Sequence, residues 1–232
     1  MITVCKYFLY FIIYSFAGWL MEVICKFIEQ KKFINRGFLI GPICPIYGHG
    51  ILAIILLIGK NTTDVLSVFL KAILVCSVLE YLTSYFMEKL FKARWWDYSK
   101  RRFNLNGRIC LETMLPFGIL GTTIVYIIHP LVVKFVDLFS SNLIIIIAII
   151  LFIIYLSDNI ITYIVMNKIK LEIKKQTVDS KEITPKKVDN TELIHKKVIE
   201  WLDSNSYLYR HIKSAFPKFR INEKVLKRIK HE

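Results

Sequence analysis

Five apolar runs, each long enough to cross a bilayer as a helix, dominate this sequence. They extend over roughly Tyr7 to Cys25, Gly37 to Ile58, Val65 to Phe91, Ile109 to Val133 (with Pro130 closing it) and Leu143 to Met166. About 20 consecutive apolar residues span the hydrocarbon core, and 55% of the 232 residues are hydrophobic. The first run is longer than the apolar part of a signal peptide and lacks a small-residue cleavage site, so we expect it to remain attached. The sequence therefore predicts an all-α, polytopic membrane protein with about five transmembrane helices.

The distribution of Lys and Arg predicts the direction of insertion, because both are retained on the cytoplasmic side. The loops after the first and third runs are basic, and so is the segment after Met166, whereas Lys60 and Lys134 stand almost alone in the other two loops. This alternation places the N-terminus outside and the C-terminus in the cytoplasm. The bilayer is then the first partner, with anionic lipid headgroups at the tail and at the 92–108 loop.

Composition divides the chain into a transmembrane domain (1–166), a flexible charged linker (167–190) and a basic amphipathic helical tail (191–232). The last 66 residues hold 17 of the 32 Lys and Arg. Thr191 is a candidate helix cap, and a second tail helix is expected from Asn222. The first tail helix would share one apolar face, made of Ile194, Val198, Trp201 and Leu202. We expect this tail to lie at the membrane surface or on a partner.

Polar residues gather at the cytoplasmic end of every predicted span. The intramembrane acids are Glu22, Glu80, Glu88, Glu112 and Asp158. Glu80 lies eight residues before Glu88, about 12 Å deeper at a rise of about 1.5 Å per residue, which is too deep for snorkelling. Because an ionised carboxylate facing lipid is expensive, we predict a polar cavity that opens to the cytoplasm. Alternatively, Glu22, Glu88 and Glu112 pair with Arg36, Arg94 or Arg108 as assembly contacts.

The start of the second run, Gly41 to Gly50, places two prolines and three glycines at membrane depth. Such residues interrupt a regular helix, and irregular backbone at that depth must be buried in protein or line a wet cavity. Its free carbonyls and amides could hold a ligand; alternatively, Gly48 and Gly50 serve tight helix packing. His49 is either a proton acceptor or a packing residue.

Two sets of candidate residues follow from these patterns. The cavity or ligand-binding candidates are Glu22, Arg36, Tyr47, His49, Glu80, Thr83, Arg108, Glu112 and Asp158. The candidates for a cytoplasmic docking segment or interface, within 92–108, are Trp95, Trp96, Asp97 and Tyr98. Indoles beside cations also suit a simple interfacial anchor, while Asp97 could instead orient a ligand.

Several classes of chemistry have no signature in this chain. The five cysteines are scattered without a Cys-x-x-Cys pair, so no metal or redox site is expected. Nucleotide-binding loops and known catalytic motifs are also missing. We expect no cofactor here, and ATP only through a separate partner subunit. The basic charge follows from loops and tail rather than from a nucleic-acid groove.

Ordered motifs resemble a known family of bacterial membrane proteins. They are Ser15-Phe16-Ala17-Gly18-Trp19 with Glu22, Asn35-Arg36-Gly37-Phe38-Leu39 with Gly41-Pro42, Cys44-Pro45-Ile46-Tyr47-Gly48, Glu80-Tyr81 with Thr83-Ser84, Trp95-Trp96-Asp97-Tyr98-Ser99, Phe103-Asn104, and Asn106-Gly107-Arg108-Ile109-Cys110-Leu111. Over roughly residues 5–130 the chain resembles the ABC-transporter type IV (CmpB-like) permease family. The resemblance implies a permease that works with a separate ATP-binding subunit.

Three functions remain open from the sequence. The first is a transporter subunit whose cavity binds a cationic or amphiphilic solute, either with an ATP-binding partner or as a homo-oligomer. The second is a membrane-embedded enzyme acting on an inner-leaflet or lipid-linked substrate, with Glu80, Asp97 or His49 as general base and Arg36 or Arg108 holding a phosphate. The third is a non-catalytic scaffold that recruits partners through the tail.

Overall fold

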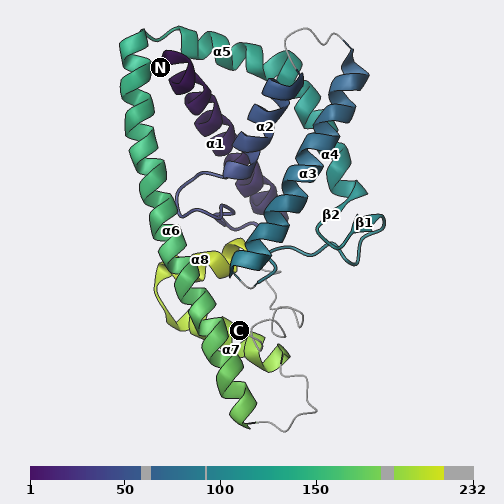
Figure 1. Ribbon diagram of the computed structural model, residues 1–232, viewed down its shortest axis with the longest axis vertical. Coiled ribbons are helices and arrows are strands. Elements are labelled where there is room, and N and C mark those ends of the chain that lie inside the picture. The colour runs from purple at the N-terminus through teal and green to yellow at the C-terminus, as the bar shows by residue number, and fades with distance from the viewer. Residues whose placement is uncertain (59–63, 92, 184–190, 217–232) are drawn as a thin grey trace.

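Helices make up nearly all the regular structure of this protein (Figure 1), for which a computed structural model describes residues 1–58, 64–91, 93–183 and 191–216. The elements are α1 (Ile2–Gln30), α2 (Pro45–Ile58), α3 (Val65–Phe91), β1 (Asn104–Leu105), β2 (Ile109–Cys110), α4 (Leu111–Thr123), the π-helical turn η1 (Ile124–Ile128), α5 (His129–Asp137), α6 (Ser141–Ile183), α7 (Thr191–Ser204) and α8 (Tyr207–Ala215). The predicted all-α class is confirmed.

Four helical segments within the described ranges are long and apolar enough to cross a membrane: Ile2–Gln30, Val65–Phe91, Leu111–Asp137 and Ser141–Val178. The predicted run from Gly37 to Ile58 is different, because its first eight residues are irregular and only α2 is helical. Its 14 residues extend about 21 Å at about 1.5 Å per residue, less than the roughly 30 Å of the hydrocarbon core. The helix interruption expected from Gly41 and Pro42 is thus present.

The fourth apolar segment continues beyond Pro130, where the sequence predicts its end. Pro130 lies in the first turn of α5, which runs on to Asp137. A proline is tolerated there because first-turn amides lack an intrahelical acceptor. Figure 1 shows α5 lying across the end of the helix bundle between α4 and α6. The segment therefore changes direction instead of stopping at the proline.

Helix α6 is much longer than the predicted fifth span. Residues 167–183, expected as linker, continue it as a helix to Ile183, while 184–190 and the helix expected from Asn222 lie outside the described residues. The physical reason is an apolar face: Met166, Ile169 and Ile173 are almost fully buried. This face packs against α7 and α8 in one core with the end of α3, joined by Ile194, Val198, Leu202, Ile212, Phe91 and Trp95. The tail is therefore folded onto the chain itself.

Helices α1 and α2 approach closely because glycines face the partner helix. A Cβ on Gly18 would overlap the Tyr47 ring, and a Cβ on Gly48 would overlap Ser15 and Phe11. The Cys44 amide also donates to the Ser15 carbonyl at 2.9 Å. The packing interpretation of this glycine-rich segment thus holds at Gly48, and the close approach turns Tyr47 toward Glu22 on α1, with the Tyr47 hydroxyl 2.7 Å from it.

Candidate functional site

A cavity of about 430 Å³ lies where α1, α2 and α3 meet the loop between α3 and α4. Five of the predicted cavity residues line it: Glu22, Arg36, Tyr47, Glu80 and Thr83. The four predicted docking residues, Trp95, Trp96, Asp97 and Tyr98, line the same cavity. The two sets of candidates, treated separately above, therefore meet in one place.

Glu22 is neutralised inside this cavity. The Tyr47 hydroxyl donates a hydrogen bond to Glu22 Oε1 at 2.7 Å, and Arg36 Nε lies 3.7 Å from Glu22 Oε2. Arg36 comes from the irregular segment before α2, so a loop cation faces a helix acid. A paired and hydrogen-bonded carboxylate keeps its charge at low cost.

Glu80 differs from Glu22 because no cationic side chain among the described residues balances its carboxylate. Its side chain is deep in the protein, with only 8% of the residue exposed. Its Oε1 accepts a hydrogen bond from the Tyr98 hydroxyl at 3.3 Å, whereas Oε2 is buried with no hydrogen-bond partner. Within the described part of the chain, no Lys or Arg forms an ion pair with Glu80. Glu80 is thus a buried acid that faces the cavity without a counter-charge.

Tyr98 holds Glu80 from the loop side. Burial, and then the charge of Glu80, raise the pKa of the Tyr98 phenol well above its ordinary value. The phenol therefore remains protonated and acts as a donor. Its backbone is fixed too, since the Tyr98 amide donates to the Gly107 carbonyl at 2.8 Å.

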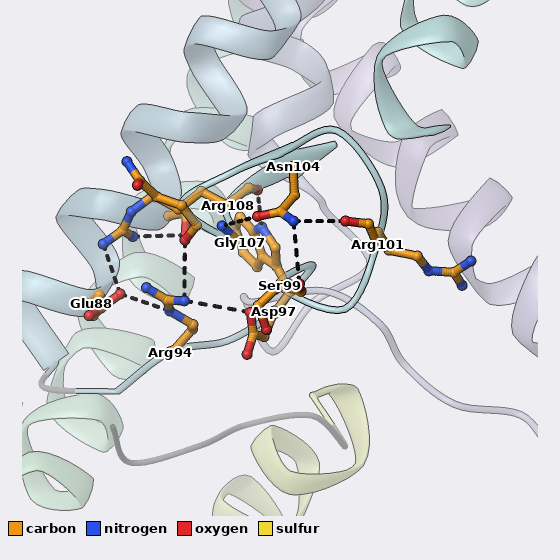
Figure 2. Close-up of polar contacts among 11 residues, drawn as sticks. Glu88, Arg94, Asp97, Ser99, Arg101, Asn104, Gly107 and Arg108 are labelled. Atoms are coloured by element: carbon orange, nitrogen blue, oxygen red, sulfur yellow. Dashed lines mark hydrogen bonds and ion pairs between the residues drawn. The ribbon is translucent and has the colours of Figure 1, made fainter. Parts of the chain in front are cut away.

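A network of charges anchors this loop on α3 (Figure 2). Glu88 Oε2 lies 3.1 Å from Arg94 Nε and 2.9 Å from an Arg108 guanidinium nitrogen. Arg94 also reaches Asp97 at 3.5 Å, and Arg108 donates to Ser84 at 3.1 Å. Because the side chains of Glu88, Arg94 and Arg108 are 10–15% exposed, removing one partner would leave a buried charge uncompensated, which costs more than breaking a surface pair. These ion pairs hold the two ends of the loop together.

The short β1–β2 hairpin lets the loop turn back toward α3. Gly107 adopts φ +67, a left-handed conformation that suits glycine, and a Cβ there would lie 2.6 Å from Asp97. The Trp96 indole donates to the Arg108 carbonyl at 3.0 Å. Trp95 is only 2% exposed and packs in the core with α6 and α8. The interfacial-anchor interpretation is therefore wrong for Trp95.

The other four predicted cavity residues lie elsewhere. His49 is exposed, contacts the Pro45 carbonyl at 2.8 Å and packs edge-on against Phe11. Arg108 belongs to the Glu88 network, and Glu112 forms an exposed pair with Arg101 at 2.9 Å. Asp158 accepts the amides of Ile40 and Gly41, each at 3.0 Å, so it stabilises the irregular segment from outside the cavity. Each of these four polar side chains therefore has a partner outside the cavity.

Phe216 is one of several cavity residues that the sequence predictions do not include, and it comes from the tail. Its ring lines the cavity and lies edge-on to Trp95 with the ring centroids 5.0 Å apart. The Arg36 guanidinium sits 6.0 Å from the Phe216 centroid and donates to the Ala215 carbonyl. Nothing in the local sequence joins a tail phenylalanine to Trp95, because the two meet only through the packing of α6, α7 and α8.

The site thus combines two ion-paired acids, Glu22 and Asp97, with one acid that forms no ion pair among the described residues, Glu80, and with an aromatic wall. Such an arrangement can bind and orient a ligand through charge, hydrogen bonds and ring faces. Metal binding has little support, because the described residues contain no group of three or more His, Cys, Asp or Glu side chains that could hold an ion.

Comparison with known proteins gives one match. A protein-family model described as "Putative ABC-transporter type IV" matches residues 9–163, which include every cavity residue named above except Phe216. No curated protein and no solved structure matches the chain.

Proposed function

This chain belongs to the ABC-transporter type IV family, and on that premise we propose that it is the membrane-spanning permease subunit of a transporter. In this proposal the cavity bordered by Glu22 and Glu80 receives a cationic or amphiphilic solute from the cytoplasm. The residues that bind it are Glu22, Arg36, Tyr47, Glu80, Thr83, Asp97 and Tyr98. ATP would be bound by a separate subunit, because this sequence lacks a phosphate-binding loop.

The proposed topology has five crossings. Residues 37–44 and α2 together make the second crossing, since irregular backbone at membrane depth is tolerated where protein or a cavity covers it. Figure 1 shows α1, α2, α3 and α4 alternating in direction. The N-terminus is then outside, and the basic segments around Arg36, around Arg94 and in the tail share the cytoplasmic end. The cavity lies at that end.

The observation that carries the proposal is the uncompensated Glu80 inside a cavity of about 430 Å³. Intramembrane acids that face a cavity mark substrate or ion pathways in membrane proteins. A purely structural acid would be paired, as Glu88 is with Arg94 and Arg108. Glu80 has instead been left facing the space that a solute would fill.

The enzymatic alternative has part of its candidate set in the cavity. The candidate bases Glu80 and Asp97 line the cavity, as does Arg36, one of the two candidate phosphate ligands. Asp97, however, pairs with Arg94, and Arg36 pairs with Glu22. The other candidates, His49 and Arg108, do not line the cavity: His49 contacts the Pro45 carbonyl, and Arg108 pairs with Glu88.

The test combines purification with transport. The full chain is purified from membranes of its own host, and co-purifying ATP-binding proteins are identified by mass spectrometry. Efflux of radiolabelled tetraphenylphosphonium, used as a cationic amphiphile, from preloaded cells is then compared among cells expressing the natural chain, Glu80→Gln and the exposed-pair control Glu112→Gln. We expect an ATP-binding partner, and a loss of transport only in Glu80→Gln. Recovery of no such partner, together with unchanged transport by Glu80→Gln, would refute the proposal.

A further inference from the structure

We infer that the cavity ligand is a monovalent organic cation with an aromatic or alkyl body, held by Glu80. This inference rests on the proposed function, because it names the solute class of the same cavity. It follows from three properties of the described lining: its net charge, the nature of its walls and its capacity for metal ligands.

The charge of the lining points to one positive charge on the ligand. Three acids line the cavity, namely Glu22, Glu80 and Asp97, together with two cations, Arg36 and Lys26. Lys26 pairs with Glu29, which is not part of the lining. Glu22 pairs with Arg36 at 3.7 Å, and Asp97 pairs with Arg94 at 3.5 Å. Glu80 is more deeply buried than either and forms no ion pair within the described ranges. A buried carboxylate is stabilised by a partner of opposite charge or by a proton, and in the inferred complex a single cationic centre of the ligand takes that place.

The walls indicate what the cation carries. Aromatic rings from Tyr47, Trp95, Trp96, Tyr98 and Phe216 surround the space, and ring faces attract cations. Aliphatic side chains of α2 and α3 close the remainder, including Ile54 and Leu79. Cavities of about 300–1,000 Å³ with apolar walls and few polar groups accept drug-sized molecules. An apolar body attached to the charged centre would therefore be removed from water by the aromatic walls and by the aliphatic walls of the cavity.

An inorganic cation fits the same lining poorly. Ca²⁺ requires six to eight oxygen ligands, and Mg²⁺ requires octahedral geometry. The described residues provide no cluster of three potential metal ligands, and two of the three acids already have cations beside them. An anionic ligand would meet the uncompensated Glu80 and be repelled. Among charged ligands, the organic cation is the class that remains.

Binding of two matched probes tests this inference. The full chain in lipid nanodiscs is titrated with benzyltrimethylammonium and with neopentylbenzene, its uncharged carbon isostere, and binding to empty nanodiscs is subtracted. We expect the natural chain to prefer the cation by about tenfold or more, equal to about 1.4 kcal/mol. Glu80→Gln, which keeps the side-chain shape, should lose that preference, whereas Glu112→Gln should retain it. Thermal unfolding of each variant shows whether it is folded.

Equal affinity of the natural chain for the two probes, or an unchanged preference in folded Glu80→Gln, would overturn the inference. These outcomes are distinct from failure of the proposed function. Cation binding without transport or an ATP-binding partner would refute only the permease, whereas Glu80-dependent transport of an uncharged solute without a cation preference would refute only the ligand class.

A different observation carries a second inference, which concerns the tail. We propose that α8 and Phe216 close the cavity as an intramolecular cap. His211 Nε2 lies 3.2 Å from the Leu39 carbonyl, and Arg36 donates to the Ala215 carbonyl. The Phe216 ring then sits between Arg36 and Trp95. A segment far along the chain is thus bound to the loop and the indole that border the cavity.

Accessibility of Cys44, which lines the cavity, tests the cap. The full chain is treated with a methanethiosulfonate reagent, and modification of Cys44 is followed by peptide mass spectrometry, with exposed Cys25 as internal reference. Phe216→Ala should accelerate Cys44 modification several-fold, whereas Tyr207→Ala, an exposed position of the same helix, should leave the rate unchanged. An unchanged rate in Phe216→Ala would refute the cap, and so would an equal acceleration in Tyr207→Ala.

Discussion

The Tyr98 hydroxyl donates a hydrogen bond to Glu80 Oε1 at 3.3 Å. The bond connects the loop between α3 and α4 with the middle of α3, one of the long apolar helices. This bond joins the two parts of the site, because Tyr98 belongs to the loop that Glu88 anchors and Glu80 belongs to α3. The Thr113 side chain, at the start of α4, is a second hydrogen-bonding neighbour of Glu80.

Tyr98→Phe removes that donor and leaves the buried carboxylate without it. Loss of one partner from a buried charged group destabilises by about 1–3 kcal/mol. The free energy of unfolding, measured in mixed micelles, should therefore decrease by that amount. Tyr207→Phe, at a position 65% exposed, serves as the control and should change the free energy of unfolding by less than about 0.5 kcal/mol. Equal stabilities of the two variants would show that the Tyr98 bond contributes nothing.

Arg108→Gln should be strongly destabilising because it leaves Glu88 with one cation fewer in a buried setting. Breaking a buried pair by removing one partner costs about 3–5 kcal/mol; the remaining Arg94 contact should bring the loss toward the lower end. The matched control is Arg101→Gln, whose pair with Glu112 has side chains 58% and 56% exposed and should be worth at most about 1 kcal/mol. A smaller loss in Arg108→Gln than in Arg101→Gln would contradict the anchoring role of the network.

Two glycines of α2 should respond oppositely to alanine. In Gly48→Ala the new Cβ would overlap Ser15 and Phe11, and overpacking costs about 1–3 kcal/mol. In Gly50→Ala the Cβ would lie 3.5 Å from Leu79 and 3.6 Å from Cys76, an ordinary contact, and alanine favours the helix by roughly 0.5–1 kcal/mol. The unfolding free energy should fall in the first variant and stay equal or rise in the second. The reverse order would mean that α1 and α2 do not pack as described.

Docking of α8 should weaken in acid. Burial lowers the pKa of His211 below its ordinary value of 6.5, although its contacts with the Leu39 and Gly37 backbone and the charge of Asp158 oppose the shift. The undocked histidine therefore takes up a proton before the docked one does. Docking is at full strength above pH 6.5 and declines as the pH falls toward the lowered pKa.

Amide hydrogen exchange of α8, corrected for intrinsic pH dependence, measures this effect between about pH 8 and pH 5. Protection should decrease toward the acidic end in the natural chain. His211→Asn cannot titrate in this range, so its protection should be independent of pH. A pH-dependent loss of protection in His211→Asn equal to that of the natural chain would assign the effect to another group.

The sequence predicts the helical class well, because that class depends on local pattern. Val65 to Phe91 coincides with α3, since an apolar run bounded by charges defines its own ends. The depth of Glu80 relative to Glu88 also follows directly from helix geometry, and Glu80 lines the cavity that the structure contains.

The partners of the charged side chains could not be predicted from the sequence in the same way. Arg108 could face a cavity acid or Glu88, and Asp158 could face solute or backbone amides; only tertiary packing decides, and it selects Glu88 and the amides of Ile40 and Gly41. Likewise, basic composition after Met166 suggests a linker, but burial of Ile169 and Ile173 against α7 and α8 overrides that composition. Long-range contacts settle what local propensity leaves undetermined.

Helix α6 runs without interruption from Ser141 to Ile183, so a change in its tilt at one end displaces the other end. Its 43 residues extend about 65 Å at about 1.5 Å per residue. A tilt of about 5° would therefore swing one end by about 6 Å relative to the other, a displacement comparable to the helix pitch of about 5.4 Å. Small rearrangements among the membrane helices would thus be magnified at the helices that carry Phe216.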